Sequence, residues 1–258
     1  MIRAVMSEVD VVKGLKNVLE RIGVASSKRS ENLPNITPRL VAVSKTKPVE
    51  LITAVYNAGQ RHFGENYVQE LVDKAHNPEV RAKCPDVRWH LIGHLQRNKV
   101  NKVVGVPGIH LVESVDSRTL ASALDAAWGR RAAGQLRVMV QVNTSGEAEK
   151  SGCKREEVTE VVKHVVENCT NLQFVGLMTI GKYGYDPSQG PNPDYVSLLE
   201  VRKDVCLSLG VDPSQLELSM GMSDDFEQAV EMGSTNVRIG SAIFGHREKK
   251  QKSITEES

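Results

Sequence analysis

The chain has 258 residues, 40% of them hydrophobic and 25% charged, and these ordinary globular values exclude a wholly disordered protein. Lys and Arg number 33 and Asp and Glu 32, so the net charge of +1 provides no overall attraction for nucleic acid or an anionic membrane. The cysteines, Cys84, Cys153, Cys169 and Cys206, include no Cys-x-x-Cys pair, which argues against a structural zinc site and a disulfide scaffold. No apolar run approaches the roughly 20 residues of a membrane-spanning helix.

The start of the chain carries no targeting pattern. Residues 1–6 are too short for the apolar core of a signal peptide, and Glu8 and Asp10 are untypical of a transit peptide. We therefore expect a cytoplasmic protein. A minor mitochondrial pool stays open, because Met6 offers a second start after Met1.

The first predicted element is an amphipathic helix over residues 7–22. Ser7 is placed to cap this helix, with Asp10 three residues later. One face of the helix carries the apolar residues Val9, Val12, Leu15, Leu19 and Ile22. Residues 25–38 are polar and contain two prolines, which indicates a linker. We expect residues 1–38 to form a helix and linker that pack on the following domain.

Short β-type runs alternate with helical patterns from Leu40 onward. The eight predicted strands are Leu40–Val43, Arg61–Gly64, Arg88–Ile92, His110–Val115, Arg137–Val142, Phe174–Ile180, Leu216–Met220 and Asn236–Ile239. The helical patterns cover approximately residues 48–58, 66–75, 97–104, 117–128, 154–167, 194–209 and 224–232. Eight strand–helix units predict a parallel α/β fold, a single (β/α)8 TIM barrel over residues 39–246. The competing interpretation is an open doubly wound sheet, although no Gly-x-Gly-x-x-Gly motif follows the first strand.

Two segments interrupt this alternation. Residues 181–193 are rich in Gly and Pro and follow the sixth strand, so we expect a loop on the functional rim of the barrel. Residues 247–258 are charged and lack periodicity, which is typical of a disordered tail.

Lys45 is the sharpest functional signal, because chemistry in barrels of this kind lies at the C-terminal ends of the strands. It directly follows an apolar strand, so its amine should lie near the barrel mouth. A lysine there can lose its proton through desolvation or beside another cation such as Lys47, and then act as a Schiff-base nucleophile. The alternative is an ordinary solvated loop lysine.

Strands seven and eight indicate a phosphate site, since the loops that follow these strands often bind phosphate in barrels. Small side chains, hydroxyls and accessible backbone N–H groups are supplied by Ser219, Gly221, Ser223, Gly240 and Ser241. Such groups bind phosphate without a large positive charge. Structural Gly/Ser turns have the same composition, so this alternative stays open.

Arg238 is expected to point into the barrel. It lies between Val237 and Ile239 on the eighth strand, and successive side chains of a strand point to opposite faces. A buried guanidinium needs an acceptor, because an unpaired buried charge is costly. That acceptor is either a ligand or a neighbouring carboxylate.

Two further patterns favour structural interpretations. His90 and His94 are four residues apart, but a metal pair at that spacing needs a helix, and here a strand enters a turn. We expect hydrogen-bonded core or rim groups and no metal site. Asp224 and Asp225 are typical of the first turn of a helix, with Ser223 as its cap. The absence of Gly-x-Ser-x-Gly and Gly-Lys-[Ser/Thr] motifs disfavours a common hydrolase or nucleoside triphosphatase.

Six segments, in order, resemble the pyridoxal phosphate homeostasis protein family. They are residues 42–48 (AVSKTKP), 63–70 (FGENYVQE), 89–99 (WHLIGHLQRNK), 176–179 (GLMT), 218–226 (LSMGMSDDF) and 237–245 (VRIGSAIFG). The resemblance runs from about Leu40 to Gly245, which is most of the chain, and the insertion at 181–193 resembles the eukaryotic branch.

The resemblance implies a fold-type III barrel, shared with the N-terminal domain of alanine racemase, and pyridoxal 5′-phosphate (PLP) as the cofactor. It implies that Lys45 holds PLP as an internal aldimine, that Arg238 faces the pyridine nitrogen, and that Asn66 lies near the ring. The other implied cofactor contacts are Ser219, Met220, Gly240 and Ser241, of which the two serines and the glycine contact the phosphate. Ser241 stands where threonine is common, and the hydroxyl is retained.

Arg238 and the chain length favour binding over turnover. Arginine only donates hydrogen bonds, so a pyridine nitrogen facing it stays unprotonated and the ring is a weaker electron sink. Related racemases carry a second, β-rich domain that normally supplies a second proton-transfer group, whereas 13 residues follow Gly245 here. We therefore expect a protein of intracellular vitamin B6 homeostasis that holds PLP as a reversible Schiff base and supplies it to apo-enzymes. We expect little or no turnover and assign no catalytic residue.

Two alternatives remain open. One is a PLP-dependent enzyme of the amino-acid racemase type, and the other is a PLP-free aldolase that uses Lys45 as its nucleophile. The expected partners are PLP, apo PLP-dependent enzymes and PLP-producing enzymes, with no nucleic acid and no membrane. The expected oligomeric state is a monomer or weak dimer.

Overall fold

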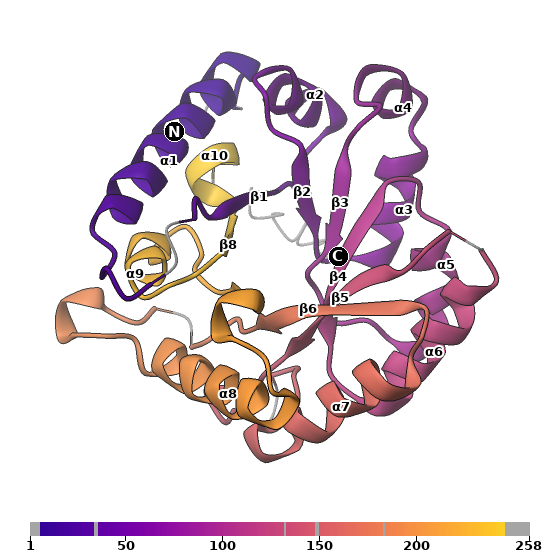
Figure 1. The fold of residues 1–258 in the computed structure, drawn as a ribbon. Helices are drawn as coiled ribbons and strands as arrows, with labels where there is room; N and C mark the ends of the chain where they lie inside the picture. Colours follow the sequence, from indigo (N-terminus) through magenta and orange to yellow (C-terminus); the bar gives the residue numbers. More distant parts are fainter. Residues whose placement is uncertain (1–5, 34–35, 132, 148–149, 183, 246–258) are drawn as a thin grey trace, which may run out of the picture.

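Eight parallel strands close into a barrel in the computed structural model, which describes residues 6–33, 36–131, 133–147, 150–182 and 184–245. The strands are β1 (Arg39–Val43), β2 (His62–Glu65), β3 (Arg88–Leu91), β4 (Ile109–Val115), β5 (Leu136–Gln141), β6 (Leu172–Met178), β7 (Glu217–Ser219) and β8 (Asn236–Ile239). Each strand pairs with the next, and β8 pairs with β1 (Figure 1). This closure confirms the predicted (β/α)8 barrel and excludes the open sheet.

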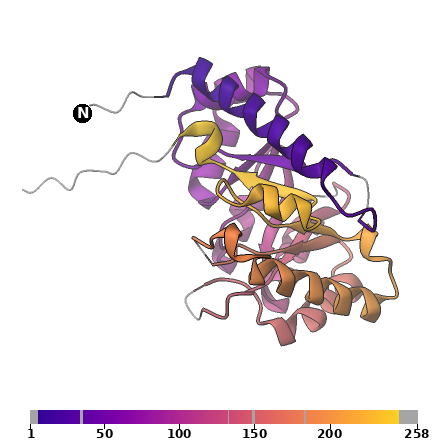
Figure 2. The same ribbon diagram turned by 90° about the vertical axis from the view of Figure 1, so that its left-hand side faces the viewer.

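Helices form a ring around the barrel (Figures 1 and 2). The α-helices are α1 (Glu8–Ser27), α2 (Val49–Asn57), α3 (Val68–His76), α4 (Pro78–Lys83), α5 (Val100–Val104), α6 (Arg118–Gly129), α7 (Val158–Asn168), α8 (Pro193–Leu209), α9 (Phe226–Glu231) and α10 (Ser241–Phe244). Short 3-10 turns are η1 (Arg97–Lys99), η2 (Arg155–Glu157), η3 (Pro187–Gln189) and η4 (Pro213–Gln215). Each predicted helix is present, whereas α4 and α10 were not expected. Within the described residues no helix has the length and apolar character needed to cross a bilayer.

Helix α1 begins at the predicted cap. Ser7 Oγ accepts the Asp10 N–H, and the Asp10 carboxylate accepts the Ser7 N–H, which completes a capping box. The helix continues five residues beyond its predicted end, and its packing face differs from the prediction. The buried residues are Val11, Leu15, Val18, Ile22 and Ala25. Val9 and Leu19, expected on that face, are 61% and 46% exposed, because the helix turns the stripe starting at Val11 toward its neighbours α2, α9 and α10.

Close packing of α1 on α10 connects the N-terminal helix with the end of the last strand. A Cβ on Gly14 would lie 2.8 Å from the backbone carbonyl oxygen of Ile243 in α10. Only glycine permits this approach. Helix α10 directly follows Gly240, so α1 supports the segment that carries two of the predicted cofactor contacts. The predicted tail at 247–258 lies outside the described residues.

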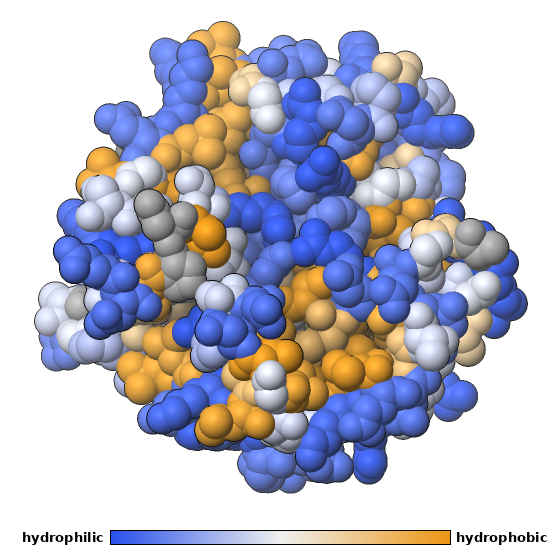
Figure 3. All heavy atoms as spheres, viewed as in Figure 1, coloured by the Kyte–Doolittle hydropathy of each residue, from blue (hydrophilic) through white to orange (hydrophobic). Residues whose placement is uncertain are grey.

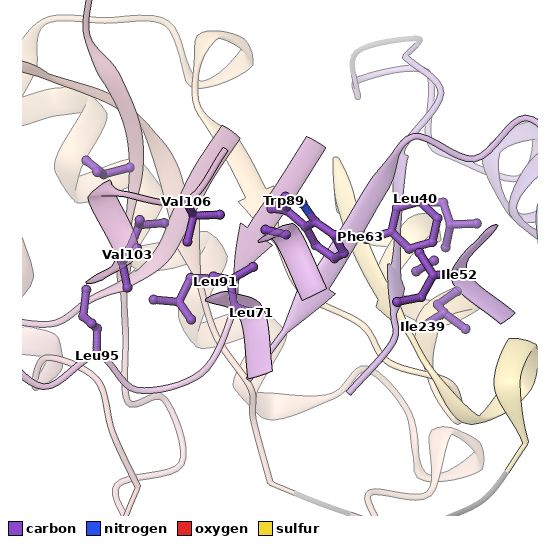
Figure 4. Packing of buried hydrophobic residues seen from close by; sticks show 14 of the residues in the cluster. Leu40, Ile52, Phe63, Leu71, Trp89, Leu91, Leu95, Val103, Val106 and Ile239 are labelled. Carbon is purple, nitrogen blue, oxygen red and sulfur yellow. The ribbon is translucent and has the colours of Figure 1, made fainter. Parts of the chain in front are cut away.

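The two faces of the barrel wall differ in chemistry. Apolar side chains on one face pack beneath the helices, as Leu40, Phe63, Trp89 and Ile239 do together with Ile52 of α2 (Figure 4). The alternate positions point into the barrel, where buried polar and charged residues gather. They include His90, Glu113, Ser219, Asn236 and Arg238. All four cysteines are buried free thiols, which confirms the absence of a disulfide scaffold.

The N-terminal ends of the strands face the viewer in Figure 1, and α10 lies on the far side, as the turned view shows (Figure 2). Hydrophilic residues gather over the centre of the near face, around the ends of β2 and β3 (Figure 3). The predicted site at the C-terminal ends therefore lies on the opposite side of the barrel.

Candidate functional site

The ends of β1, β2 and β8 bring predicted site residues to one edge of the barrel. Val43 of β1 pairs with Gly64 of β2, so Lys45 and Asn66, each two residues further on, reach the same level. Gly240, which follows β8, closely approaches Val43, since a Cβ on it would lie 3.3 Å from the Val43 carbonyl oxygen. Parallel strands end together, and this register gathers the lysine, the asparagine and the glycine from three separate motifs.

The chain before Lys45 is anchored by a buried network centred on Lys74 of α3. Lys74 Nζ donates to the Ser44 carbonyl oxygen at 2.7 Å, to Glu65 Oε1 at 2.8 Å and to Glu70 Oε1 at 2.6 Å. Ser44 Oγ donates to Glu65 Oε1 at 2.6 Å. Burial raises the pKa of the Glu65 carboxyl, and the charge of Lys74 opposes that shift. The network fixes the end of β1, directly before Lys45, from the side of α3.

The turn directly after Lys45 is held in an unusual conformation. Thr46 has a φ of 63°, and no other non-glycine residue in the described chain has a positive φ. This left-handed region is costly for a residue with a branched side chain. The Thr46 N–H donates to Glu70 Oε1 at 2.6 Å, which compensates part of that cost. Lys45 therefore sits between two anchored residues, at a point where strain is stored.

The side chain of Asn66 carries an unpaired hydrogen-bond acceptor. Its Oδ1 is buried and has no hydrogen-bond partner in the structure. Buried polar atoms in proteins are nearly always paired, so this oxygen is suited to a donor from a ligand. Gly93 packs against its backbone so closely that a Cβ would collide with the Asn66 carbonyl group. A pocket of about 270 Å³ adjoins Asn66, with Lys99 and Lys102 on its wall.

The loops after β7 and β8 meet at Ser223. Its Oγ accepts the backbone N–H groups of Gly240 and Ala242, each at 3.3 Å. Backbone N–H groups of this kind bind anionic oxygens, but here both donate to Ser223 Oγ, so an anion would have to replace that hydroxyl as their acceptor. Ser241 lies between the two donors and is half-buried. The structure brings Ser223, Gly240 and Ser241 together at this point, and their contact with a phosphate stays a prediction.

The predicted cap of the helix after β7 is wrong. Ser223 faces α10 rather than capping α9, which begins at Phe226 with Asp225 in the N-cap position. The Asp225 carboxylate accepts the Met222 N–H at 2.7 Å and the Tyr195 hydroxyl at 2.6 Å. The tertiary approach of β8 to this loop, rather than the local sequence, decides which partner Ser223 takes.

Arg238 lies inside the barrel, as the strand alternation predicts, and is 4% exposed. Its Nη1 donates to Ser219 Oγ, and its Nη2 donates to the Thr179 carbonyl oxygen at 2.7 Å. Ser219 Oγ also accepts from Asn236 Nδ2 at 2.9 Å and donates to Glu113 Oε2. A hydroxyl has one donor and two acceptor positions, so all three are used. The predicted phosphate contact of the Ser219 hydroxyl would require one of these bonds to break.

The Met220 side chain and His90 lie apart from that edge, whereas His94, in the loop after β3, lines the pocket that adjoins Asn66. The Met220 side chain packs with Leu218 in the apolar cluster between sheet and helices, so only its backbone can face a cofactor. His94 lies on the rim, where its Nδ1 is 3.2 Å from Asp116 Oδ2. His90 lies inside the barrel, so His90 and His94 do not form a pair.

The loop at 181–193, expected on the functional rim, is tied to the segment that follows β7. Gln228 of α9 donates through Nε2 to the Gly190 carbonyl oxygen at 2.7 Å and accepts the Asn192 N–H at 3.2 Å. The described part of this loop therefore borders the β7 side of the barrel mouth.

Three histidines inside the barrel were not predicted as a group. His62, His90 and His110 come from β2, β3 and β4, and their ring centroids are 5.1 to 5.4 Å apart. Burial lowers the pKa of His62 to about 2 and that of His110 to about 3, and the neighbouring charges act in the same direction. Burial also lowers the pKa of His90, although the hydrogen bond and the charge of Glu113 act to raise it. All three rings are therefore neutral near pH 7.

These histidines predict a loss of stability in mild acid. An unfolded histidine binds a proton as the pH falls through about 6.5, whereas the folded rings stay neutral to much lower pH. The unfolded chain then holds more protons, so the free energy of unfolding decreases, by at most about 1.4 kcal/mol per pH unit for each histidine and less where solvent screens the ring.

Denaturant unfolding at about pH 7.5 and about pH 5.5 measures this effect, because carboxyl groups titrate mainly below about pH 4.5. We expect His62→Gln to reduce the difference between the two pH values. His76→Gln, a change at an exposed histidine, should leave that difference as in the wild type. An unchanged difference in His62→Gln would contradict this account.

The chain matches the family model "Alanine racemase, N-terminal domain" over residues 27–248. It is 52% identical over 247 residues to the pyridoxal phosphate homeostasis proteins of Bos taurus and of Homo sapiens, matches that cover 95% of this chain and 90% of each relative. The solved structure of PipY from Synechococcus elongatus PCC7942 with PLP bound is similar with a TM-score of 0.70 and 32% identity. That match covers 88% of this chain and all of PipY.

Proposed function

This chain belongs to the pyridoxal phosphate homeostasis protein family, and we propose that it binds PLP reversibly and covalently on Lys45 and supplies it to apo-enzymes. The observation that carries the proposal is the convergence at one barrel edge of a lysine, a loop with two converging backbone N–H groups, and a buried arginine. Lys45 follows β1, the N–H groups of Gly240 and Ala242 converge after β8, and Arg238 lies beneath them in the barrel.

The residues present fit PLP. When bound, PLP supplies an aldehyde that condenses reversibly with a primary amine and releases water. Lys45 would provide the amine, and the N–H groups of Gly240 and Ala242, which donate to Ser223 Oγ in this structure, would donate to the phosphate oxygens instead. Arg238 would donate to the pyridine nitrogen. The unpaired Oδ1 of Asn66 supports a ligand at this edge.

Arg238 supports a role with little or no turnover. A guanidinium in a protein stays protonated, so it donates a hydrogen bond without transferring its proton to the ring. The ring nitrogen then lacks the positive charge that strong carbanion chemistry needs. The Schiff-base attachment suits a carrier because amine exchange reverses it. The proposal includes a cytoplasmic location with a minor mitochondrial pool, a monomeric or weakly dimeric state, and PLP-producing enzymes as a source.

An amino-acid racemase is the second candidate, and the match to the alanine racemase N-terminal family model is the observation that favours it. The two functions differ in what consumes the bound PLP. A carrier loses PLP to an acceptor once, whereas a racemase retains PLP and turns over substrate continuously.

Transfer from loaded protein to an acceptor tests the proposal. The protein is loaded with PLP, freed of excess by gel filtration, and mixed with the apo-form of a PLP-dependent enzyme. We expect the enzyme activity to recover while the visible band of the loaded protein declines, and amino-acid enantiomers incubated with it to keep their optical activity. Retention of PLP in the presence of acceptor would contradict the carrier function. Sustained racemisation that requires Lys45 would establish the second candidate instead.

A further inference from the structure

A chain of hydrogen bonds enters the barrel from the face opposite Lys45. Arg88, at the exposed start of β3, approaches His62 with 3.4 Å between Nη1 and Nε2. His62 Nδ1 lies 2.8 Å from His90 Nε2. His90 Nδ1 lies 2.6 Å from Glu113 Oε1. Arg88 and Glu113 are thus connected through two neutral imidazoles along the inside of the barrel.

The groups at both ends of this hydrogen-bond chain determine which ring nitrogens of His62 and His90 carry a proton, and they agree. Arginine only donates, so His62 Nε2 is an acceptor and its Nδ1 carries the proton. An ionised carboxylate only accepts, so His90 Nδ1 carries a proton and its Nε2 accepts from His62. Every bond therefore points from the N-terminal mouth toward Glu113.

A second set of donors reaches Glu113 from the cofactor side. Arg238 Nη1 donates to Ser219 Oγ, which donates to Glu113 Oε2. Asn236 Nδ2 lies 3.1 and 3.2 Å from the two carboxylate oxygens. Burial opposes ionisation of Glu113, but the bonds from His90 and Ser219 and the charge of Arg238 outweigh it and lower the pKa of the carboxyl. Glu113 is the acceptor on which both sets end.

The same histidines have the spacing of a metal site, since one nitrogen from each lies within 4.8 Å of the others. Their lone pairs are nevertheless engaged. His62 Nε2 accepts from Arg88, and His90 Nε2 accepts from His62. His110 Nε2 lies 3.1 Å from Arg137 Nη1 and accepts from it. Zinc needs free imidazole lone pairs, and the adjacent arginines repel a cation. The hydrogen bonds therefore favour a structural chain over a metal centre.

We propose that Glu113 is a positioning residue that holds Arg238 in place for the pyridine nitrogen of PLP, and that His90, supported by His62, orients and charges Glu113. This inference rests on the proposed function. Glu113 acts on Arg238 through the Ser219 hydroxyl and as its buried counter-charge. Without that charge the buried guanidinium keeps only neutral acceptors, Ser219 Oγ and the Thr179 carbonyl oxygen.

Further charged groups lie at the end of the hydrogen-bond chain that is near the N-terminal ends of the strands. Arg39 and Arg137 both pair with Glu217, at the N-terminal end of the barrel. Glu217 is thus a second carboxylate inside the same barrel that makes no contact with Arg238 among the described bonds. It provides a matched control for Glu113.

The test uses four variants of the full chain, each loaded with PLP. Glu113→Gln removes the charge at constant size. His90→Leu removes the donor to Glu113, whereas His90→Asn retains an N–H donor near the position of Nδ1. Glu217→Gln is the control. Two quantities are measured: the midpoint of the pH titration of the visible band, and the rate of PLP release after dilution. Circular dichroism establishes that each variant is folded.

We expect Glu113→Gln and His90→Leu to shift the titration midpoint and to speed PLP release by about tenfold or more, the change expected for loss of a hydrogen bond to a charged group. His90→Asn should return both quantities toward the wild type, and Glu217→Gln should leave them unchanged. A general loss of packing would not produce rescue by His90→Asn.

The positioning role is overturned if folded Glu113→Gln shows wild-type titration and release. If Glu113→Gln does not fold, the two His90 variants decide, and equal behaviour of His90→Asn and His90→Leu overturns the role. A wild-type chain that acquires no visible band with PLP contradicts the proposed function itself, which distinguishes the two failures.

Discussion

Lys45→Ala is expected to lose covalent retention of PLP completely while keeping the fold. Lys45 follows β1 at the barrel edge, and the bonds that anchor this segment come from the backbone and side chains of its neighbours. Removal of the Nζ amine therefore deletes the group that would react with the aldehyde and leaves the anchoring network in place. The visible band that remains after extensive dialysis, measured beside the circular dichroism spectrum, reports both parts of this prediction.

Lys47→Ala is the matched control, because it removes an amine two residues away on the same loop. We expect this variant to keep the dialysis-resistant band. Retention of the band in Lys45→Ala together with its loss in Lys47→Ala would move the attachment to the other lysine and contradict the account.

Lys74→Met is expected to destabilise the protein by about 3–5 kcal/mol, the cost of leaving one member of a buried ion pair without its partner. Lys74 Nζ bridges Glu65, Glu70 and the Ser44 carbonyl oxygen, and both Lys74 and Glu65 are buried. Methionine retains most of the side-chain volume, so packing changes little. The midpoint of denaturant unfolding measures the loss at neutral pH.

Lys83→Met provides the comparison for this change. Lys83 pairs with Glu79 across one turn of α4, at 2.8 Å between Nζ and Oε1, and the two side chains are 57% and 38% exposed. Exposed pairs contribute little, so the unfolding midpoint should stay close to that of the wild type. Equal effects of Lys74→Met and Lys83→Met would show that the buried network does not anchor the end of β1.

The regular alternation of the chain made the barrel predictable. Most strands carry apolar residues that alternate or run together, and the longer helices have the periodicity of one buried face. Helices α4 and α10, of six and four residues, were not predicted. The face of α1 was misjudged because two overlapping apolar stripes fit the helix, and only contact with α9 and α10 selects the one that starts at Val11.

The candidate site residues that follow from the position of a single strand could be predicted from the sequence. The contacts that form only when the barrel closes could not. Lys45 and Arg238 were identified from their own strands. The hydrogen bonds of Glu113 were not predicted because its partners Ser219 and Asn236 lie 106 and 123 residues away and reach it only across the closed barrel. Strand alternation shows which side chains point inward but not which of them meet.

Borohydride reduction of the PLP-loaded wild-type protein, followed by peptide mass mapping, tests the central claim most directly. Reduction converts a reversible bond between lysine and PLP into a permanent phosphopyridoxyl adduct that survives digestion. The account predicts this adduct on the peptide that contains Lys45. An adduct confined to another lysine, or a wild-type protein that shows none after loading, would contradict it.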